Sequence, residues 1–289
     1  MNKSDETRTR PPSELRTIDV YGTRLYVVIG QGDTGRPPLL LINGLGANLE
    51  SFDPFLEAFA NLEGQKIGTI RFDVPGVGRS PLPLFPLRFS GLAYIIAKML
   101  DALGQPYVDV LGFSWGGGLA QQFAHQYPQR CRHLVLVATS TGAISVPGRP
   151  DVLAKLLSPH GYFQPSYLAS IAPALYGGRF RSDPELVRIY TELARAPGSL
   201  GYYWQLLASA GWTSIPWIHR LRQPTLILAG DDDPVVPPIN ARIMARLIPN
   251  ATLHIINGGH LFLLTEAQEV APLVHQFLTS DTFMTKRRG

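Results

Sequence analysis

Apolar residues are spaced in two ways along this chain. Short continuous apolar runs, each as long as a strand, alternate with longer segments in which apolar residues recur every three or four positions, as on one face of a helix. The runs that predict strands are 17–20, 25–28, 38–42, 67–72, 108–111, 133–138, 224–230 and 252–256. The segments that predict helices between them are 52–62, 92–103, 119–127, 239–247 and 265–278.

Strands and helices that alternate in this way predict an α/β fold, in which a mostly parallel sheet of eight strands is flanked by helices. The first two strands enclose Tyr21-Gly22-Thr23, which predicts an antiparallel hairpin at the start of the sheet. The run 38–42 is apolar throughout, as expected of a strand that is covered on both faces.

The region 141–222 departs from this alternation. It is rich in proline, glycine and aromatic residues, and it contains stretches of helical pattern at 151–157, 167–174, 184–196 and 201–210. Because it leaves one sheet strand and returns to the next, we expect an inserted helical lid over the strand ends. The predicted organisation is a flexible N-terminal tail at 1–14, an α/β core at 15–140 and 223–280, the lid at 141–222 and a basic C-terminal tail at 281–289.

A Gly-x-Ser-x-Gly motif lies between a strand pattern and a helix pattern. It comprises Gly112, Ser114 and Gly116, with Phe113 and Trp115 at the variable positions. A serine on such a sharp turn has its hydroxyl exposed, and the flanking glycines leave room for a strained backbone. This context predicts that Ser114 is a nucleophile and not a residue of an ordinary glycine-rich turn.

A serine hydroxyl needs a base to take its proton and a carboxylate to orient that base. Of the seven histidines, His260 directly follows the last strand, at the edge where the carboxyl ends of parallel strands meet. The preceding strand ends in three consecutive aspartates at 231–233, which gives the chain order serine, acid, histidine. Asp233 is favoured because Pro234 stiffens the chain beside it, while the other two aspartates remain alternatives that could cap the turn.

Two backbone N–H groups are expected to bind the oxyanion that forms during acyl transfer. Trp115 follows the nucleophile, and Leu45 lies in a glycine-rich loop after the strand 38–42. Asn43, in the same loop, is a candidate for substrate binding.

Aromatic residues gather in the second half of the predicted lid. Tyr202, Trp204 and Trp212 are candidates for lining an apolar substrate entrance. The alternative is that a small helical lid needs large side chains for its own core, and the two explanations can hold for different residues.

Composition narrows the classes of function. Hydrophobic residues are 45% and charged residues 17% of the chain, which excludes wholesale disorder. Much of the formal net charge of +4 comes from the two ends, and no basic stripe interleaved with aromatic residues is present, so no nucleic-acid partner is expected. Neither a cluster of metal ligands nor a dinucleotide fingerprint is found, so no metal and no cofactor are expected.

The chain also carries signals about location. Its first residues are polar and lack the apolar core of a secretory signal, and no apolar run approaches the ~20 residues of a membrane helix. The single cysteine, Cys131, excludes an internal disulfide and fits a reducing compartment. We therefore expect a cytoplasmic protein without an integral membrane span, and the oligomeric state is left open.

With these residues assembled, the sequence resembles the α/β-hydrolase superfamily over essentially its whole length. Several segments are similar to those of intracellular medium-chain-length poly(3-hydroxyalkanoate) depolymerases, and the lid segments matter most because lids vary widely among hydrolases. The segments that carry this resemblance are 43–50, 72–78, 114–117, 201–206, 211–215, 229–234 and 259–263.

The resemblance implies an enzyme that cleaves an intracellular storage polyester, held in granules, to 3-hydroxy acids or oligomers through an acyl-enzyme. It carries the roles of nucleophile, acid and base onto Ser114, Asp233 and His260. The alternatives are a small-molecule carboxylesterase, lactonase or carbon–carbon hydrolase with the same triad, a perhydrolase, and, from another class, a non-catalytic protein that binds granules or a small ligand.

Overall fold

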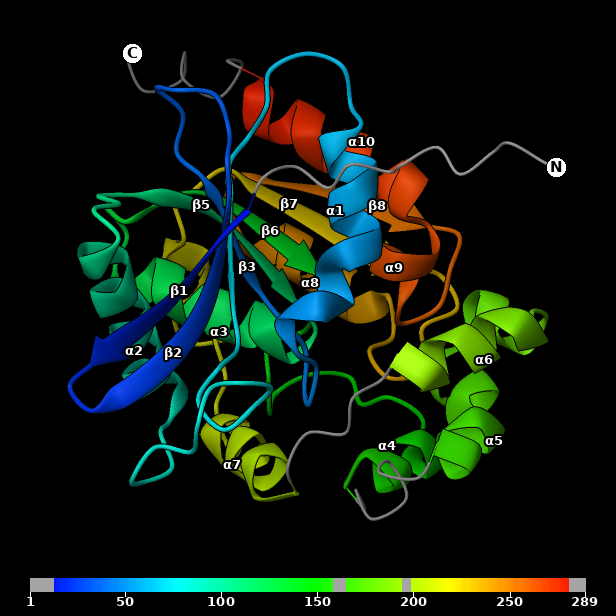
Figure 1. The fold of residues 1–289 in the computed structure, drawn as a ribbon. Coiled ribbons are helices and arrows are strands. Elements are labelled where there is room, and N and C mark those ends of the chain that lie inside the picture. The colour runs from blue at the N-terminus through cyan, green and yellow to red at the C-terminus, as the bar shows by residue number, and fades with distance from the viewer. Residues whose placement is uncertain (1–12, 158–164, 194–198, 281–289) are drawn as a thin grey trace, which may run out of the picture.

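The computed structural model describes residues 13–157, 165–193 and 199–280. Within these ranges eight strands form one sheet in the order β1-β2-β4-β3-β5-β6-β7-β8 (Figure 1). β2 is antiparallel to its neighbours β1 and β4, and every other neighbouring pair is parallel. The predicted fold class is therefore confirmed. The strands are β1 Ser13–Val20, β2 Thr23–Gly30, β3 Leu39–Ile42, β4 Thr69–Phe72, β5 Val108–Phe113, β6 Cys131–Val137, β7 Thr225–Gly230 and β8 Ala251–Ile256.

Helices cover both faces of the sheet. They are η1 Leu49–Phe52, α1 Asp53–Ala60, α2 Phe89–Ala102, α3 Trp115–Gln126, α8 Ile239–Leu247, α9 Phe262–Thr265 and α10 Ala267–Thr279. Residues of α2, α3 and α8 share one apolar core with one side of the sheet, and residues of α1, α9 and α10 share another core with the opposite side. The central strand β3 is apolar throughout because both of its faces are buried. Leu40 and Ile42 belong to the first core, and Leu39 and Leu41 belong to the second.

The segment between β6 and β7 is mainly helical, as the sequence predicts. Its elements are α4 Pro150–Leu157, α5 Pro165–Tyr176, η3 Gly178–Arg181, α6 Pro184–Leu193, α7 Ser199–Ser209 and η4 Ile218–Arg220. Figure 1 shows α4 to α7 beyond one end of the sheet, where α4, α5 and α6 lie near one another and α7 lies to one side of them. The tail residues 1–12 and 281–289, and the parts of the predicted lid at 158–164 and 194–198, lie outside the described residues.

Two boundaries differ from the prediction. β1 begins at Ser13, so the tail predicted to end at residue 14 is shorter, because Ser13 pairs with Gly30 at the far end of the hairpin. The helix predicted over 265–278 corresponds to α10, which begins two residues later, and Thr265 belongs to the separate short helix α9, since Glu266 between them leaves the helical conformation with φ −115° and ψ 31°. The hairpin turn itself has φ 50° at Tyr21 and 80° at Gly22, the positive values that a tight two-residue turn requires.

Candidate active site

Ser114 lies where β5 passes into α3, in the middle of the sheet. Its backbone has φ 53° and ψ −118°, a conformation that a residue with a side chain rarely adopts and that costs about 1–3 kcal/mol. The surrounding chain holds it there, because its N–H donates to the Val137 carbonyl at 2.8 Å and its own carbonyl accepts from the Gly117 N–H at 2.9 Å. This is the strained strand-to-helix turn that the motif predicts.

The glycines of the motif are needed because other atoms pack closely against them. A Cβ atom on Gly112 would lie 2.6 Å from the Cβ of Ala120, well inside van der Waals contact. A Cβ atom on Gly116 would collide with the carbonyl oxygen of Ile42 on the neighbouring strand. The sharp turn at Ser114 therefore depends on the absence of side chains two residues on either side.

His260 reaches Ser114 from the loop after β8. Its Nε2 lies 2.9 Å from the Ser114 Oγ, although 146 residues separate the two in sequence. The ring is almost fully buried and lies beside Phe113, with 5.5 Å between ring centroids. The backbone N–H of His260 donates to the Tyr176 carbonyl at 2.6 Å. The end of α5, in the inserted segment, therefore helps to position the loop that carries His260.

Asp233 completes the chain of hydrogen bonds. Its Oδ2 lies 2.8 Å from the His260 Nδ1, and its Oδ1 accepts the backbone N–H groups of Val235 and Val236, each at 2.8 Å. A carboxylate can only accept, so it selects the tautomer in which His260 Nδ1 carries the proton and Nε2 presents its lone pair to Ser114.

The other two aspartates of the run serve the backbone nearby. Asp231 accepts the N–H of Gly258 at 3.0 Å, and Asp232 accepts the N–H of Gly178 at 2.7 Å while pairing with Arg181 at 3.1 Å. Of the three candidates, the structure therefore brings Asp233 against His260.

The two expected oxyanion donors lie at the start of α3 and in the loop that follows β3. Trp115 is the first residue of α3, where a backbone N–H has no partner within the helix. In the other loop, the N–H groups of Gly44 and Gly46 donate to Asn43 Oδ1 and Gln205 Oε1, at 3.0 and 2.7 Å. The Leu45 N–H between them makes no hydrogen bond with any described residue, so it is free to bind a ligand oxygen.

The candidates for substrate binding lie in different environments. Asn43 is buried and its side chain supports the loop, with Oδ1 on Gly44 and Nδ2 donating to the Asn48 carbonyl. Trp204 is half-buried on α7.

Two of the predicted lid aromatics serve the packing of the insertion. Tyr202 is buried, and its hydroxyl donates to the Leu156 carbonyl at 2.7 Å; burial raises the pKa of that hydroxyl. Trp212 donates through Nε1 to Gln122 at 2.8 Å and packs edge-on against Phe89, with 5.0 Å between centroids. For Tyr202 the structure favours the explanation that the lid needs large side chains for its own core, whereas Trp212 packs the insertion against α2 and α3.

Gln205, on α7, is a residue that sequence reasoning missed. Its Oε1 accepts the N–H of Gly46, and its backbone carbonyl accepts the indole N–H of Trp115 at 2.8 Å, so it contacts the loop that carries Leu45 and also contacts Trp115 itself. The side chain is 3% exposed, and its Nε2 has no hydrogen-bond partner among the described residues. The signal in the sequence is a lone amide within an otherwise apolar helix.

Asp73, directly after β4, joins the start of η1 to the turn that follows β4. Its two carboxylate oxygens accept the backbone N–H groups of Leu49 and Arg79, at 2.8 and 2.9 Å. Burial is the main cause that raises the pKa of this carboxyl. These contacts indicate a structural role for Asp73.

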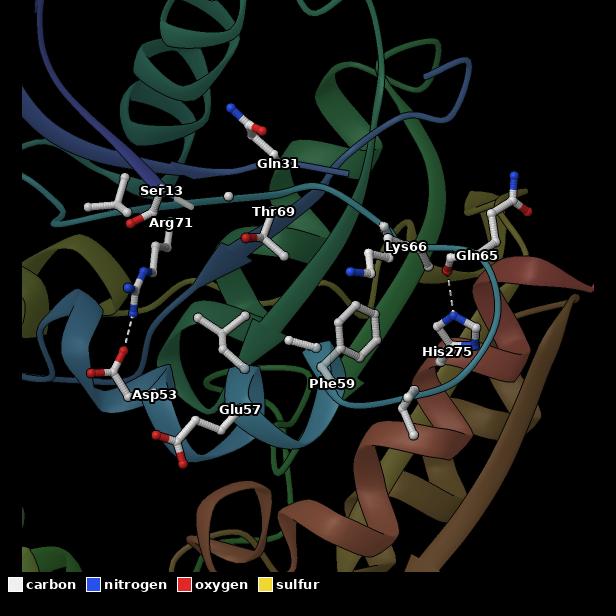
Figure 2. Close-up of a pocket in the computed structure, with 16 residues that line it drawn as sticks. Ser13, Gln31, Asp53, Glu57, Phe59, Gln65, Lys66, Thr69, Arg71 and His275 are labelled. Carbon is white, nitrogen blue, oxygen red and sulfur yellow. Dashed lines mark hydrogen bonds and ion pairs between the residues drawn. The ribbon is translucent and has the colours of Figure 1, made fainter. Parts of the chain in front are cut away.

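A separate pocket of about 100 Å³ lies away from these residues, where β2 and β4 meet α1 and α10 (Figure 2). It contains the ion pair between Arg71 and Asp53, and His275 there faces the Gln65 carbonyl at 2.8 Å. None of the residues that line it belongs to the Ser114 constellation.

Comparison with known proteins places the chain in a family. Residues 37–267 match the family model of the alpha/beta hydrolase fold. A poly(3-hydroxyalkanoate) depolymerase of Ectopseudomonas oleovorans is 52% identical over 270 residues, which make up 93% of this chain and 94% of that protein. A 3-oxoadipate enol-lactonase 2 of Acinetobacter baylyi is 28% identical over 244 residues, or 84% of this chain and 88% of that protein.

Solved structures agree on the fold. The crystal structure of the enol-lactonase from Burkholderia xenovorans LB400 has a TM-score of 0.78 and 21% identity over 92% of this chain and all of that one, a likeness of fold alone. The resemblance to poly(3-hydroxyalkanoate) depolymerases that the sequence motifs carry is confirmed by the relative at 52% identity. The chain belongs to the α/β-hydrolase fold family.

Proposed function

We propose that the protein hydrolyses the ester bonds of a medium-chain-length poly(3-hydroxyalkanoate), with Ser114 as nucleophile, His260 as general base and Asp233 as the carboxylate that orients the histidine. The observation that carries the catalytic part is the unbroken chain of hydrogen bonds from Asp233 through His260 to Ser114, at 2.8 and 2.9 Å. The substrate class is supported by the depolymerase relative at 52% identity.

The proposed reaction has two stages. His260 Nε2 takes the proton of Ser114 as its Oγ attacks the ester carbonyl, and the tetrahedral oxyanion is bound by the N–H groups of Leu45 and Trp115. Collapse of this intermediate releases an alcohol, which takes the proton from His260, and leaves an acyl group on Ser114. A water molecule, deprotonated by His260, then releases the 3-hydroxy acid end and restores the serine.

The inserted segment 141–222 acts, in this proposal, as a lid over the site. Two contacts support this role: the Tyr176 carbonyl accepts the N–H of His260, and Gln205 contacts the Gly46 loop and Trp115.

Among the described residues, no helix is both long and apolar enough to cross a membrane. We propose that the enzyme acts in the cytoplasm on the surface of storage granules.

The proposal is tested by comparing three substrates: a suspension of a medium-chain polymer, a suspension of short-chain poly(3-hydroxybutyrate), and the soluble ester para-nitrophenyl butyrate. We expect the medium-chain suspension to clear and the Ser114→Ala variant to be inactive on every substrate while remaining folded. Turnover of the soluble ester alone would support the triad and reject the polymer, leaving a small-molecule esterase or lactonase. Binding to polymer without turnover of any ester would favour the non-catalytic alternative.

A further inference from the structure

Helix α7 is apolar on its outer face as well as its inner one. Its eleven residues, SLGYYWQLLAS, include no charged side chain. The inner face buries Tyr202 and Gln205, whereas Leu200, Tyr203 and Leu207 are 50%, 37% and 50% exposed. A helix on the surface of a protein normally carries charged or polar residues on its outer face, so the outer face of α7 needs a partner or another explanation.

The loop between β4 and α2 presents a second set of exposed apolar residues. Residues 81–87, PLPLFPL, are uncharged, and within them Leu82, Leu84 and Phe85 are 42%, 89% and 74% exposed. Three prolines restrict the backbone of this loop, so these side chains are presented by a stiff segment.

The loop and the helix form one surface. A Cβ atom on Gly76, in the same loop, would lie 2.9 Å from the Leu82 side chain and 3.2 Å from the Cα of Gly201, so Gly76 packs between the loop residue and the helix residue. Arg88, at the end of the loop, donates through Nη1 to the Leu207 carbonyl at 2.8 Å and through Nη2 to the Ala210 carbonyl. These carbonyls lie at and just beyond the end of α7, where the helix dipole also favours a cation.

We call this surface the apolar rim and define it by its exposed side chains. They are Leu82, Leu84, Phe85, Leu200, Tyr203 and Leu207. Figure 1 shows the segment that follows β4 running beside α7. Single exposed apolar residues are common on protein surfaces and need no explanation. A group of six, on two segments that are joined by packing and hydrogen bonds, indicates an interaction site.

The apolar rim adjoins the candidate active site. It lies on the outer side of α7, the helix whose inner side contacts the Gly46 loop through the Gln205 side chain and Trp115 through the Gln205 carbonyl. A surface seated on the rim would therefore be separated from the Ser114 turn by little more than the thickness of one helix.

We propose that the apolar rim is the surface by which the enzyme adsorbs to solid medium-chain polyester. This inference rests on the proposed function. The polymer is uncharged and carries long apolar side chains, and it matches a surface whose six exposed side chains are all uncharged. An anionic lipid surface is a poorer match, because helices that bind such surfaces carry several Lys or Arg beside their apolar face, whereas residues 199–209 have none and the adjoining Arg88 donates to the carbonyls of Leu207 and Ala210.

The test replaces three well-exposed rim residues by serine, in the variant Leu84→Ser, Phe85→Ser, Leu207→Ser. A matched control replaces exposed apolar residues of the first and last strands of the sheet, Leu15→Ser and Ile255→Ser, which are 53% and 38% exposed in the native protein. Each protein is assayed for co-sedimentation with a medium-chain polymer suspension and with phosphatidylglycerol vesicles, for the rate of clearing, and for kcat/KM on soluble para-nitrophenyl butyrate.

We expect the rim variant to lose about tenfold or more in polymer binding and in the rate of clearing, as for the loss of several apolar contacts. Its kcat/KM on the soluble ester should stay within about twofold, because no rim residue contacts the hydrogen-bonded chain from Asp233 to Ser114. The control variant should behave as the native protein on both substrates.

The alternative outcomes are separable. If the native enzyme clears polymer and the rim variant clears it equally well, or loses soluble-ester turnover in parallel, the adsorption role is overturned while the proposed function stands. If the native enzyme clears no polymer at all, the proposed function fails and the adsorption role fails with it. If the rim variant loses binding to phosphatidylglycerol vesicles but keeps binding to polymer, the rim serves a lipid surface instead.

Discussion

Asp233→Asn is the substitution whose outcome the geometry determines most closely. The native carboxylate accepts three hydrogens: two from the backbone N–H groups of Val235 and Val236 on Oδ1, and one from His260 on Oδ2. An asparagine has one accepting oxygen and one donating NH₂ group. It must therefore satisfy either the backbone or the histidine.

The backbone N–H groups of Val235 and Val236 determine how the asparagine side chain is oriented. Turning the NH₂ group toward Val235 and Val236 would leave two part-buried N–H groups without an acceptor, and each would lose a hydrogen bond to a charged group, worth about 1.5–3 kcal/mol. The asparagine oxygen therefore stays on the backbone, and the NH₂ group faces His260 Nδ1. The ring must then accept at Nδ1 and carry its proton on Nε2, where it can no longer take the proton of Ser114.

We expect kcat on a soluble ester to fall by about 10⁴, the loss that follows the same change of tautomer in a serine-protease triad, which corresponds to about 5.5 kcal/mol in the barrier. The midpoint temperature of thermal unfolding should fall by only a few degrees, because both backbone hydrogen bonds to residue 233 are retained. The controls are Asp231→Asn and Asp232→Asn, which do not contact His260 and should keep kcat within about tenfold. Activity within tenfold of native in Asp233→Asn, with lower activity in either control, would refute the assignment of the acid.

Three further predictions follow from buried contacts. Gln205→Leu removes the acceptor of the Gly46 N–H and should lower kcat more than it raises KM on a soluble ester, whereas Gln205→Glu keeps that acceptor and should recover part of the loss; equal kinetics in both variants would contradict a role in positioning the loop. Cys131 is buried and its thiol pKa is raised by desolvation, so native protein at pH 8 should resist a thiol reagent that labels it fully in urea. Gly112→Ala forces a methyl group against Ala120 and should lower stability by about 1–3 kcal/mol in denaturant unfolding, an effect that an unchanged midpoint would disprove.

The order of elements could be predicted from the sequence because each signal is local. The apolar run of β3, the spacing of apolar residues in α3 and the Gly-x-Ser-x-Gly turn all depend on neighbouring residues, and the family match agrees with the fold they predict. The same locality explains the errors. The start of β1 depends on pairing with Gly30, and the start of α10 depends on the turn at Glu266, which no glycine or proline marks.

The finer details of the site depend on contacts between distant segments. The sequence ranked Asp233 above its two neighbours, but the distinction between the three rests on Gly258 and Gly178, which engage the other two carboxylates. Gln205 was missed because its partners, Gly46 and Trp115, lie 159 and 90 residues away in sequence. A candidate catalytic residue can be found by its motif, whereas a residue that positions the motif is found only when the chain is folded.

The central claim is that Ser114 is the nucleophile for polyester hydrolysis. Its most direct test is to treat the enzyme with a fluorophosphonate that labels activated serines, to map the labelled peptide by mass spectrometry, and to measure clearing of the medium-chain polymer by the same sample. We predict one label per chain, on Ser114, with clearing lost in proportion to labelling and no label on a His260→Ala variant. Labelling at another residue, or full clearing by protein labelled at Ser114, would contradict the account.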